Sequence, residues 1–464
     1  MAVWKKVKVG DFLFEREGRY KPDAKEIQGL QRIDKIDFSG NFHVANKPSK
    51  TDMILIKSGD LVISGINVAK GALGVYHGDA DVTATIHYSS YTFDESKVSV
   101  EFFKRFLKSP IFIQLLKEQV KGGIKTEIKP KHLLPLEIML PDKDKQLSIL
   151  SQFQRIENED AELKHELTLQ QALLKKLRQQ ILQESIGGKL TADWRAQNPD
   201  LEPASELLKR IAAEKAHLMK GRKSTAKSLP PIKDGEPSFE TPRNWEWVRL
   251  GEIVSPARGI TYGIVKMGGI PKSGGVCALR CSDVRFRRFD LRNVRKVTDD
   301  ISNQYKRTIL EGGEILLNIR GTLGGCAIVK DSMKGYNIAR EIGLIPLIDK
   351  AMNPFVLNVL TSPYFTDEIN KNLRGIAYKG LNLGILNKLL IPVPPIAEQQ
   401  EIVIRVEKLL ALCDELEDQI TRNQTHAEQL MQAVLKEAFR HNSEAEPAAK
   451  NSREIAQNSE VIGA

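Results

Sequence analysis

The sequence predicts an α+β protein in which two globular α/β modules are separated by two long antiparallel coiled-coil helices, with an internal pseudo-twofold duplication. Three observations lead to this fold class. The chain has 464 residues, is 41% hydrophobic and contains 33 glycines, a composition typical of globular proteins. Its two halves repeat each other approximately, and a long heptad pattern ends each half. At about 100–200 residues per domain, this length allows two to four domains with a core each.

Composition and cysteine spacing exclude several classes of protein. The sequence has no run of the roughly 18 apolar residues that a membrane span needs, and its first residues lack the apolar region of a signal peptide, so a cytoplasmic protein is expected. The formal net charge of +10 favours an acidic partner, most often nucleic acid. The cysteines form no C-x-x-C pair and the histidines lack metal-ligand spacing, so neither disulfides nor a metal site are expected; the four cysteines are Cys277, Cys281, Cys326 and Cys413.

The two halves match at three places. The first match pairs Trp4-Lys-Lys-Val-Lys-Val-Gly-Asp-Phe with Trp245-Glu-Trp-Val-Arg-Leu-Gly-Glu-Ile, 241 residues later. The second pairs Gly59-Asp-Leu-Val-Ile with Gly313-Glu-Ile-Leu-Leu, 254 residues later. The third pairs Ser109-Pro110 with Ser362-Pro363, 253 residues later. The framework therefore repeats while the loops differ in length.

Each module is expected to mix short strands with helices. The modules cover residues 1–142 and 244–395. Short β-branched runs bounded by glycine predict strands; these runs are Ile54-Leu-Ile, Leu61-Val-Ile, Glu314-Ile-Leu-Leu and Ala327-Ile-Val. One helix is expected in each module, over residues 99–119 and 353–373.

A long helix follows each module, over residues 143–186 and 396–440. In both, seam residues alternate at spacings of four and three, which is a heptad pattern, and the two seams match at the same shift of 253. The seam contains Leu163, Leu167, Gln170, Leu174 and Leu177 in the first helix and Leu416, Ile420, Asn423 and Leu430 in the second. Such helices reach about 60 Å.

The pseudo-twofold predicts that the two helices pair antiparallel, with Gln170 and Asn423 near the middle, where polar seam residues set the register. Two separate surface helices are the alternative. Residues 187–243 connect the halves: Gly187-Gly188 ends the first long helix, a short polar helix covers 205–219, and the Pro/Ser/Lys-rich 221–243 is expected to be an exposed linker. Residues 441–464 are expected to be a disordered tail.

Common catalytic motifs are missing from the sequence. It has no phosphate-binding loop, no nucleophile elbow, no H-E-x-x-H and no dinucleotide fingerprint. Asn198-Pro-Asp-Leu and Asn353-Pro-Phe-Val fall short of the motif of amino-methyltransferases. The acids of Pro141-Asp-Lys-Asp-Lys145 stand at a helix start, where they favour the helix dipole. The sequence therefore predicts a non-catalytic chain without catalytic or metal-binding residues.

Basic residues cluster at comparable places in the two modules. Arginine suits guanine edges and phosphates, and glycine lets a backbone approach a groove, so clusters in loops of duplicated modules favour DNA binding. The first module offers Lys121, Lys125, Lys129 and Lys131 around Gly122-Gly123. The second offers Arg374, Tyr378 and Lys379 in the equivalent stretch, together with Arg280, Arg285, Arg287, Arg288 and Arg320.

Three motifs carry a family resemblance. They are Gly187-Gly-Lys-Leu-Thr-Ala-Asp-Trp-Arg-Ala, Pro242-Arg-Asn-Trp-Glu-Trp-Val-Arg-Leu and Ile391-Pro-Val-Pro-Pro-Ile-Ala-Glu-Gln-Gln-Glu-Ile-Val. With them, residues 1–440 resemble the specificity subunit of a type I DNA restriction-modification enzyme. The first copy departs from the third motif. At the equivalent place it has Pro141-Asp-Lys-Asp-Lys-Gln146, which lacks the Pro-Pro pair and keeps only the glutamine of the Glu-Gln pair.

The resemblance implies a function for each part. The modules would be target recognition domains that each read one half of a bipartite, asymmetric double-stranded DNA target, and the helices would set the gap. Two modification subunits, which methylate adenine with S-adenosylmethionine, and two restriction subunits, which use ATP and Mg²⁺, would bind the chain, which itself holds no cofactor. The helix starts, with Gln146, Glu398 and Gln399, would be docking positions with exposed surfaces.

Other functions stay open at this point. A free-standing DNA-binding adaptor or regulator would have the same modules without enzyme partners. A scaffold would use its modules to bind protein, and its affinity for DNA would be weak and no more salt-dependent than that of any basic protein. An enzyme with an unrecognised site is the third possibility.

Overall fold

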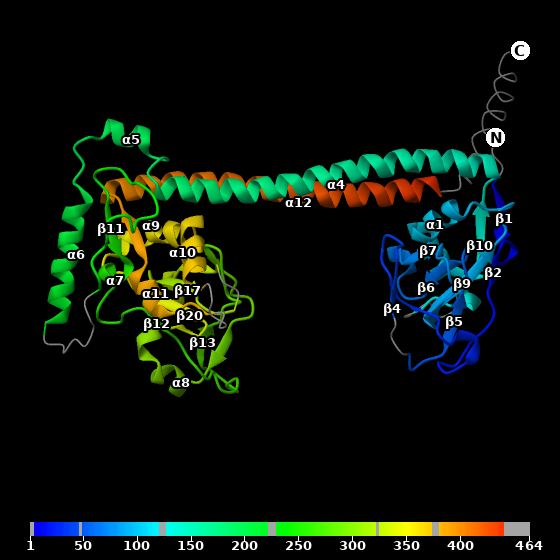
Figure 1. The fold of residues 1–464 in the computed structure, drawn as a ribbon, viewed down its shortest axis with the longest axis horizontal. Helices are drawn as coiled ribbons and strands as arrows, with labels where there is room; N and C mark the ends of the chain where they lie inside the picture. The colour runs from blue at the N-terminus through cyan, green and yellow to red at the C-terminus, as the bar shows by residue number, and fades with distance from the viewer. Residues whose placement is uncertain are drawn as a thin grey trace, which may run out of the picture. The chain divides into compact units, whose positions relative to one another are not determined.

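The computed structural model describes residues 4–45, 49–119, 127–220, 229–321, 324–373 and 380–439. It divides into two compact units: unit 1 comprises residues 1–168 and 421–464, and unit 2 comprises residues 169–420. Each unit contains one globular module together with parts of the long helices α4 (Lys143–Ile186) and α12 (Ile396–Ala438) (Figure 1). The mixed fold of two modules with long helices confirms the predicted fold class.

The described part of module 1, in unit 1, forms two four-stranded sheets and a two-stranded ladder. One sheet has the antiparallel order β2-β9-β6-β7, the other has the order β4-β3-β8-β5 with β3 parallel to β8, and β1 pairs with β10. The strands are β1 (Lys5–Lys8), β2 (Leu13–Glu15), β3 (Arg32–Ile36), β4 (Phe42–Ala45), β5 (Met53–Ile56), β6 (Leu61–Ser64), β7 (Leu73–Val75), β8 (Val82–Thr85), β9 (Tyr88–Phe93) and β10 (Glu137–Leu140).

Module 2, in unit 2, repeats this arrangement. Its strands are β11 (Glu246–Arg249), β12 (Thr261–Tyr262), β13 (Val276–Leu279), β14 (Val284–Arg285), β15 (Arg288–Phe289), β16 (Arg295–Val297), β17 (Ile315–Asn318), β18 (Cys326–Ile328), β19 (Asn337–Ile338), β20 (Ile342–Ile345) and β21 (Leu390–Val393). The order β12-β20-β17-β18 corresponds to β2-β9-β6-β7, the order β16-β13-β19 corresponds to β4-β3-β8, and β11 pairs with β21 as β1 pairs with β10.

The strand register shows that the duplication is structural. Leu61 of β6 stands opposite Tyr91 of β9, and Ile315 of β17 stands opposite Ile345 of β20, so both partners shift by 254 residues. The glycine before each strand adopts a positive φ, 89° at Gly59 and 88° at Gly313, a conformation that other residues rarely adopt. The predicted strands around these positions are therefore confirmed, and the turns that precede them are equivalent.

The expected single helix in each module is wrong, because a break divides it in two. Module 1 has α1 (Val100–Lys108) and α2 (Pro110–Gln119), and module 2 has α9 (Asn353–Leu360) and α10 (Pro363–Leu373). Proline disfavours helical backbone in the residue before it. That serine, Ser109 or Ser362, donates its hydroxyl to the carbonyl three residues earlier, at 2.7 Å in both copies. The Ser-Pro pair that marks the duplication is thus the helix break itself.

The core of unit 1 joins the module to the long helices. Phe102 and Phe106 of α1, Phe153 of α4 and Phe439 just after α12 form one aromatic cluster, with ring centroids 5.0–6.0 Å apart from that of Phe439. All four side chains are buried. Module 1 is therefore covered both by α4, which follows it directly in sequence, and by the end of the second long helix, almost 300 residues later.

Within unit 2 the long helices run antiparallel. Arg178 of α4 forms ion pairs with Asp414 and Glu417 of α12, at 2.6 and 2.9 Å. Just after the end of α4, the backbone carbonyl of Leu190 accepts a hydrogen bond from Arg405 of α12 at 2.9 Å. From Arg178 to Leu190 the residue numbers rise, while those of their partners on α12 fall from Glu417 to Arg405. The two helices therefore run in opposite directions, as the pseudo-twofold predicts (Figure 1).

Only half of the predicted seam is buried. Every seventh position is covered: Leu167, Leu174 and Ile181 on α4, and Cys413, Ile420 and Ala427 on α12. Leu163, Leu177, Leu416 and Leu430 are instead 43–62% exposed, and Gln170 and Asn423 are exposed too. Two helices alone cover a narrow stripe, so the seam prediction is wrong for the second position of each heptad.

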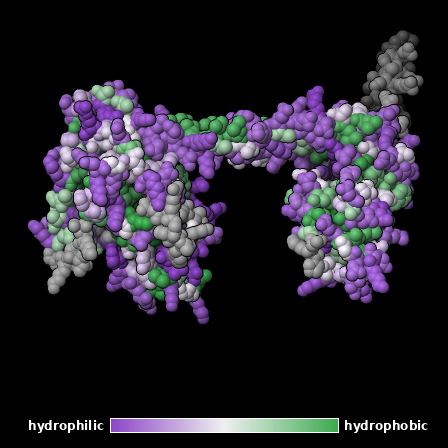
Figure 2. All heavy atoms as spheres, viewed as in Figure 1, coloured by the Kyte–Doolittle hydropathy of each residue, from purple (hydrophilic) through white to green (hydrophobic). Residues whose placement is uncertain are grey.

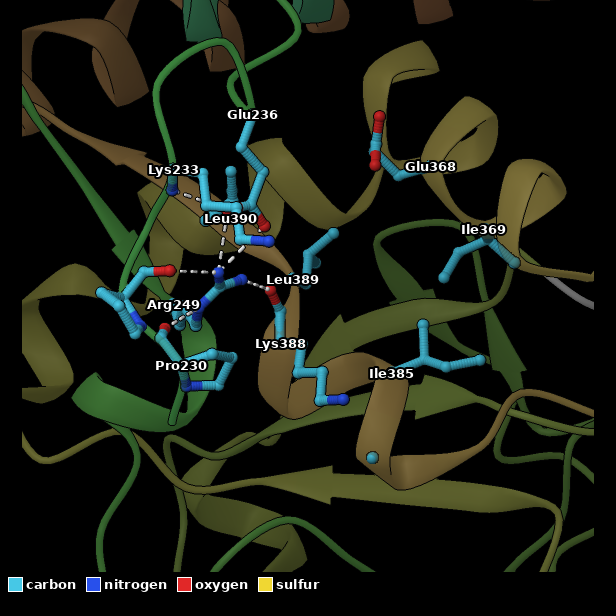
Figure 3. A pocket seen from close by; sticks show the side chains of 12 residues that line it. Pro230, Lys233, Glu236, Arg249, Glu368, Ile369, Ile385, Lys388, Leu389 and Leu390 are labelled. Carbon is cyan, nitrogen blue, oxygen red and sulfur yellow. Dashed lines mark hydrogen bonds and ion pairs between the residues drawn. The ribbon is translucent and has the colours of Figure 1, made fainter. Parts of the chain in front are cut away.

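The connector is anchored along part of its length. It contains α5 (Ala192–Gln197) and α6 (Ala204–Met219), and it continues as a segment of mostly exposed residues, 229–243, that we call the strap. The buried Arg249 of β11 donates to the carbonyls of Pro230 and Pro231 and binds Glu236 at 2.9 Å (Figure 3). The strap is exposed over most of its length, as expected, but Arg249 anchors it to module 2. The rest of 221–243 and the tail 441–464 lie outside the described residues.

Smaller elements complete the described structure: α3 (Pro130–Leu133) in module 1, and α7 (Leu250–Ile253), α8 (Asp299–Gln304) and α11 (Leu383–Lys388) in module 2. None of the helices in the described ranges has the length and hydropathy needed to cross a membrane.

Candidate nucleic-acid interface

In both modules a segment that we call the return segment, residues 127–129 in module 1 and 380–382 in module 2, passes the end of the equivalent strand. In module 1, the backbone N–H of Ile128 donates to the carbonyl of Gly65, just after β6, at 2.8 Å. In module 2, the N–H of Leu381 donates to the carbonyl of Ile319, just after β17, at the same distance. The segments that carry the predicted basic clusters therefore come back into the described structure at equivalent positions.

The predicted basic residues of module 1 are partly described. Lys129 and Lys131 are exposed, at the end of this return segment and just after it. Lys129 stands 3.7 Å from Glu127, and Glu127 in turn contacts His87 at 3.1 Å. Lys121 and Lys125 lie outside the described residues. Two of the four predicted lysines are thus exposed in module 1.

In module 2 the same edge carries Arg320. Its backbone N–H donates to the carbonyl of Glu341 at 3.2 Å, and it forms an isolated antiparallel bridge with Gly380. Arg374, Tyr378 and Lys379 lie outside the described residues, immediately before Gly380. The structure therefore brings Arg320 next to the point where the second predicted basic stretch ends.

The arginine run of module 2 is divided between surface and interior. Arg285 and Arg288 are exposed and stand directly opposite each other in the β14–β15 hairpin. Arg287 instead points inward and donates to Asn358 of α9 at 2.7 Å, and burial lowers its pKa. Arg280 donates to the carbonyl of Asn293 at 2.8 Å and also contacts Asp283. A surface role for Arg287 is therefore wrong, and Arg280 is engaged within the loop.

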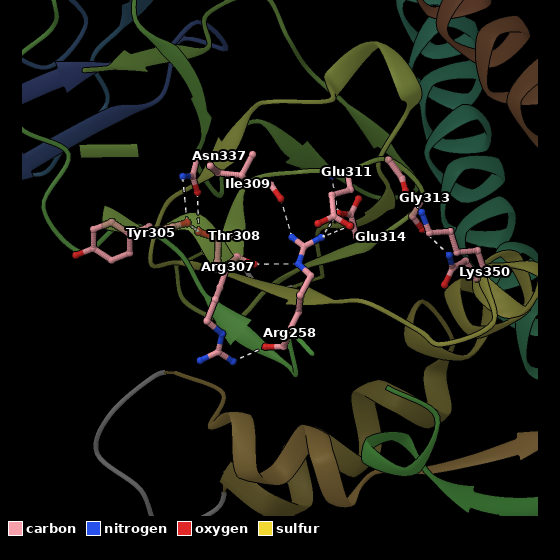
Figure 4. Close-up of polar contacts among 12 residues, drawn as sticks. Arg258, Tyr305, Arg307, Thr308, Ile309, Glu311, Gly313, Glu314, Asn337 and Lys350 are labelled. Atoms are coloured by element: carbon pink, nitrogen blue, oxygen red, sulfur yellow. Dashed lines mark hydrogen bonds and ion pairs between the residues drawn. The ribbon is translucent and has the colours of Figure 1, made fainter. Parts of the chain in front are cut away.

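An arginine–carboxylate pair stands at the start of the equivalent strand in each module, at the opposite end of β6 and β17 from Gly65 and Ile319. Arg16 binds Asp60 at 2.6 Å in module 1, and Arg258 binds Glu314 at 2.6 Å in module 2 (Figure 4). The hydrogen bond to Asp60 raises the pKa of Arg16. Both carboxylates are nearly fully buried and also accept the N–H of the residue three positions earlier. Sequence analysis missed these pairs, although Asp60 and Glu314 stand within the repeated segment.

Glu398 has a role that the sequence did not reveal. Its carboxylate is fully buried and accepts hydrogen bonds from the Thr191 hydroxyl and the Trp245 indole N–H, each at 2.8 Å, and from Arg195. These three donors come from the segment after α4 and the entry of module 2. The three motifs that suggested the family therefore meet at one carboxylate in unit 2.

The other two helix-start residues are buried as well. Gln146 donates to the carbonyl of Pro141, and Gln399 donates to the carbonyl of Pro394, at 2.9 Å in both copies. Gln146 also accepts the N–H of Ser99 at 2.8 Å. The expected exposed surface at Gln146, Glu398 and Gln399 is therefore wrong, because their side chains hold the module to the helix start; docking near them stays a prediction.

The strap borders a cavity of about 540 Å³ in unit 2 (Figure 3). Ile369, Ile385 and Leu389 line it together with Lys233 and Lys388. Each nitrogen of the Arg249 side chain donates to a carbonyl or carboxylate, so this arginine serves to hold the strap. Within the described residues, no group of three or more histidine, cysteine or acidic side chains could hold a metal ion.

Comparisons with known proteins show which family part of the chain is similar to. Residues 242–423 match the family described as type I restriction modification DNA specificity domain. The chain is 34% identical to the type I restriction enzyme EcoBI specificity subunit of Escherichia coli over 45% of this chain and 44% of that one. It is 22% identical to the EcoDI specificity subunit of Escherichia coli over 97% of this chain and 90% of that one.

A solved structure shares the fold. A chain from a study of complex assembly and conformational transition in the type I R-M system superposes with a TM-score of 0.61, at 15% identity, over 95% of this chain and 98% of that one. The stretches matched to the EcoBI, EcoEI and EcoAI subunits cover less than half of those relatives, 44–47% of their length.

Proposed function

We propose that the chain belongs to the family of type I restriction-modification specificity proteins and that it is the non-catalytic DNA sequence-specificity subunit of such a complex. Each module reads one half of a bipartite, asymmetric duplex target. The long helices set the gap between the half-sites and bind the modification and restriction subunits. The observation that carries this proposal is the duplicated edge at Gly65 and Ile319, where Ile128 and Leu381 make equivalent hydrogen bonds and the neighbouring residues include Lys129 in module 1 and Arg320 in module 2.

The chemistry of the exposed groups supports DNA as the ligand. Arg285 and Arg288 are both exposed and stand directly opposite each other on neighbouring strands, where like charges repel. Asp290, whose carboxylate interacts with the charge of Arg285, is ion-paired with Arg292 at 2.6 Å. Phosphates would remove that repulsion, and an arginine can also bind a guanine edge with two hydrogen bonds. Lys129 and Lys131 offer point charges for phosphates in module 1.

The cofactors of the reaction belong, in this proposal, to the partner subunits. Two modification subunits would bind S-adenosylmethionine and methylate adenine, and two restriction subunits would use ATP and Mg²⁺. This chain's residues would contribute recognition and positioning: the pairs at Asp60 and Glu314 hold the starts of β6 and β17, and Glu398 holds module 2 on the helix start.

The helices offer an apolar surface for the partner subunits. In unit 2, five leucines of α4 and α12 are 46–53% exposed, namely Leu169, Leu173, Leu177, Leu412 and Leu416. Apolar residues reach the surface of the helix pair in Figure 2. Exposed leucines at helical spacing are typical of a protein-binding face, because burial by further helices would remove them from water.

The first test separates the two modules. Changing Arg285 and Arg288 together to alanine should abolish methylation at one half of the bipartite motif, and changing Lys129 and Lys131 together should affect the other half. The measurement is a genome-wide map of methylated adenines in cells that carry each variant, with a cell lacking the gene as reference. Loss of two phosphate contacts should also make the slope of log binding constant against log salt concentration less steep by about 2.

The outcome decides between this proposal and an adaptor. If deletion of the gene leaves the methylation map unchanged while purified protein binds one DNA sequence, the chain is a DNA-binding adaptor. If both double variants change the same half-site, the assignment of one half-site to each module is wrong.

The second test concerns partner binding. Replacing Leu173 and Leu177 with glutamate should abolish co-purification of the modification subunits, because two charges would be buried in an apolar contact. Glu415→Lys, an exposed charge change on α12, is the matched control and should leave co-purification intact. Retained binding in the leucine double variant would exclude this face as the docking surface.

A further inference from the structure

An equivalent loop in each module exposes a phenylalanine. The loop of module 1 connects β3 to β4, and the loop of module 2 connects β13 to β16. Both connections leave a strand with a parallel neighbour, Arg32 opposite Thr83 in module 1 and Ala278 opposite Asn337 in module 2. Sequence analysis did not single out either phenylalanine, because the two loops differ in length and share no motif.

In module 1 the loop is a rigid turn that presents Phe38. The carboxylate of Asp37 accepts the backbone N–H groups of Ser39 and Asn41, at 3.0 and 2.9 Å, and these bonds keep the pKa of Asp37 well below its usual range. The Phe38 side chain is nevertheless 58% exposed. The ammonium of Lys70 stands 5.9 Å from the centroid of its ring.

In module 2 the loop forms the β14–β15 hairpin, with Phe286 and Arg287 at its tip. Phe286 is 43% exposed. Arg287 has a φ of 55°, the one positive φ of a non-glycine residue in the described ranges, and its bond to Asn358 holds the tip in place. The exposed Arg285 and Arg288 pair with each other at the base of this tip.

The two tips occupy the same place relative to the sheet. In module 1 the carbonyl of Gly40 approaches Gly74 of β7 so closely that a Cβ on that glycine would lie 2.7 Å from it. In module 2, Phe286 bridges to Cys326 of β18, the strand equivalent to β7. Each module therefore presents one aromatic ring, next to one or more cations, from the same corner of its fold.

Such a tip is unfavourable in water. An exposed phenylalanine forgoes the burial that normally stabilises it, and two arginines directly opposite each other repel. A ligand with apolar faces between rows of negative charge would relieve both costs. Duplex DNA has this chemistry, since its bases stack between two phosphate chains.

We propose, on the basis of the proposed function, that Phe38 and Phe286 insert their rings into the base stack, one at each half-site, while Lys70, Arg285 and Arg288 contact the adjacent phosphates. Each insertion unstacks one base step and kinks the duplex, so the sequence at that step contributes to specificity through its deformability. A protein partner would supply an apolar face but no row of phosphates for the two opposed arginines.

The experiment uses the complex with its modification subunits and a duplex carrying the motif found by the methylation map, with 2-aminopurine placed in turn at each step. Wild-type complex should raise the 2-aminopurine fluorescence at one step in each half-site. Phe38→Ala should abolish the rise in one half-site and Phe286→Ala in the other, each with about ten- to a hundredfold weaker binding. Tryptophan at either position should preserve the rise.

The control is Phe14→Ala, which removes a ring that is 49% exposed on strand β2 and not at a loop tip. It should leave binding and fluorescence unchanged. Because both tip rings are exposed, thermal unfolding of the variants should equal that of the wild type. If both tip variants bound DNA as tightly as the wild type, or if they lost the partner subunits while DNA binding stayed intact, this proposal would be overturned and the proposed function would stand. Absence of any sequence-specific binding by the wild-type complex would overturn the proposed function with it.

Discussion

Phe439→Ala is expected to lower the free energy of unfolding of unit 1 by about 3–5 kcal/mol, because truncating a buried phenylalanine leaves a cavity. The ring is 5% exposed and lies 5.0 Å from Phe102 and 6.0 Å from Phe153, centroid to centroid. A residue beyond the end of α12 thus stabilises a module formed by the beginning of the chain. Calorimetry, with hydrogen exchange of peptides from module 1, measures the effect.

Leu430→Ala is the matched control for this prediction. Leu430 stands in the last part of α12 and is 62% exposed, so its truncation should cost less than about 0.5 kcal/mol. Equal destabilisation by both variants, or faster exchange in module 2 instead of module 1, would contradict the packing of the helix end on module 1.

Glu398→Ala is expected to destabilise unit 2 by about 3 kcal/mol. The substitution leaves Arg195, the Thr191 hydroxyl and the Trp245 indole without their common acceptor in a buried site. The lower end of the usual range applies because the Arg195 side chain keeps 22% of its exposure to water. Calorimetry and the fluorescence of the buried Trp245 report the change.

Two further variants make this result specific. Glu398→Gln keeps the shape and one acceptor oxygen, so it should cost less than the alanine variant. Glu415→Ala removes an exposed carboxylate from α12 and should leave stability within about 0.5 kcal/mol. If Glu398→Ala were no more destabilising than Glu415→Ala, Glu398 would not hold the helix start to the segment after α4.

Local patterns predicted much of the fold. The repeated segments at Gly59 and Gly313 became equivalent strands with equivalent turns, because β-branched runs and glycine act over a few residues. The helix break at Ser109-Pro110 could also have been read locally, since proline restricts the residue before it. The seam prediction failed at Leu163 and Leu177 because heptad spacing does not tell how many helices cover a helix.

The candidate site was harder to predict, because side-chain direction depends on contacts between distant segments. Arg285, Arg287 and Arg288 look alike in sequence, yet Arg287 turns inward to Asn358, 71 residues away. Glu398 looks like a surface acid at a helix start, yet its partners Arg195 and Trp245 come from segments 203 and 153 residues earlier. No local pattern encodes these pairings.

The sequence by itself determined the duplicated α+β architecture, the long helices and the family resemblance, since these rest on periodicity and on matching segments. Only the tertiary structure decided which charges face solvent, which carboxylates hold the modules, and that Phe38 and Phe286 stand at equivalent tips. The physical reason is that burial is a property of the assembled fold, where a residue's surroundings are set by segments hundreds of positions away.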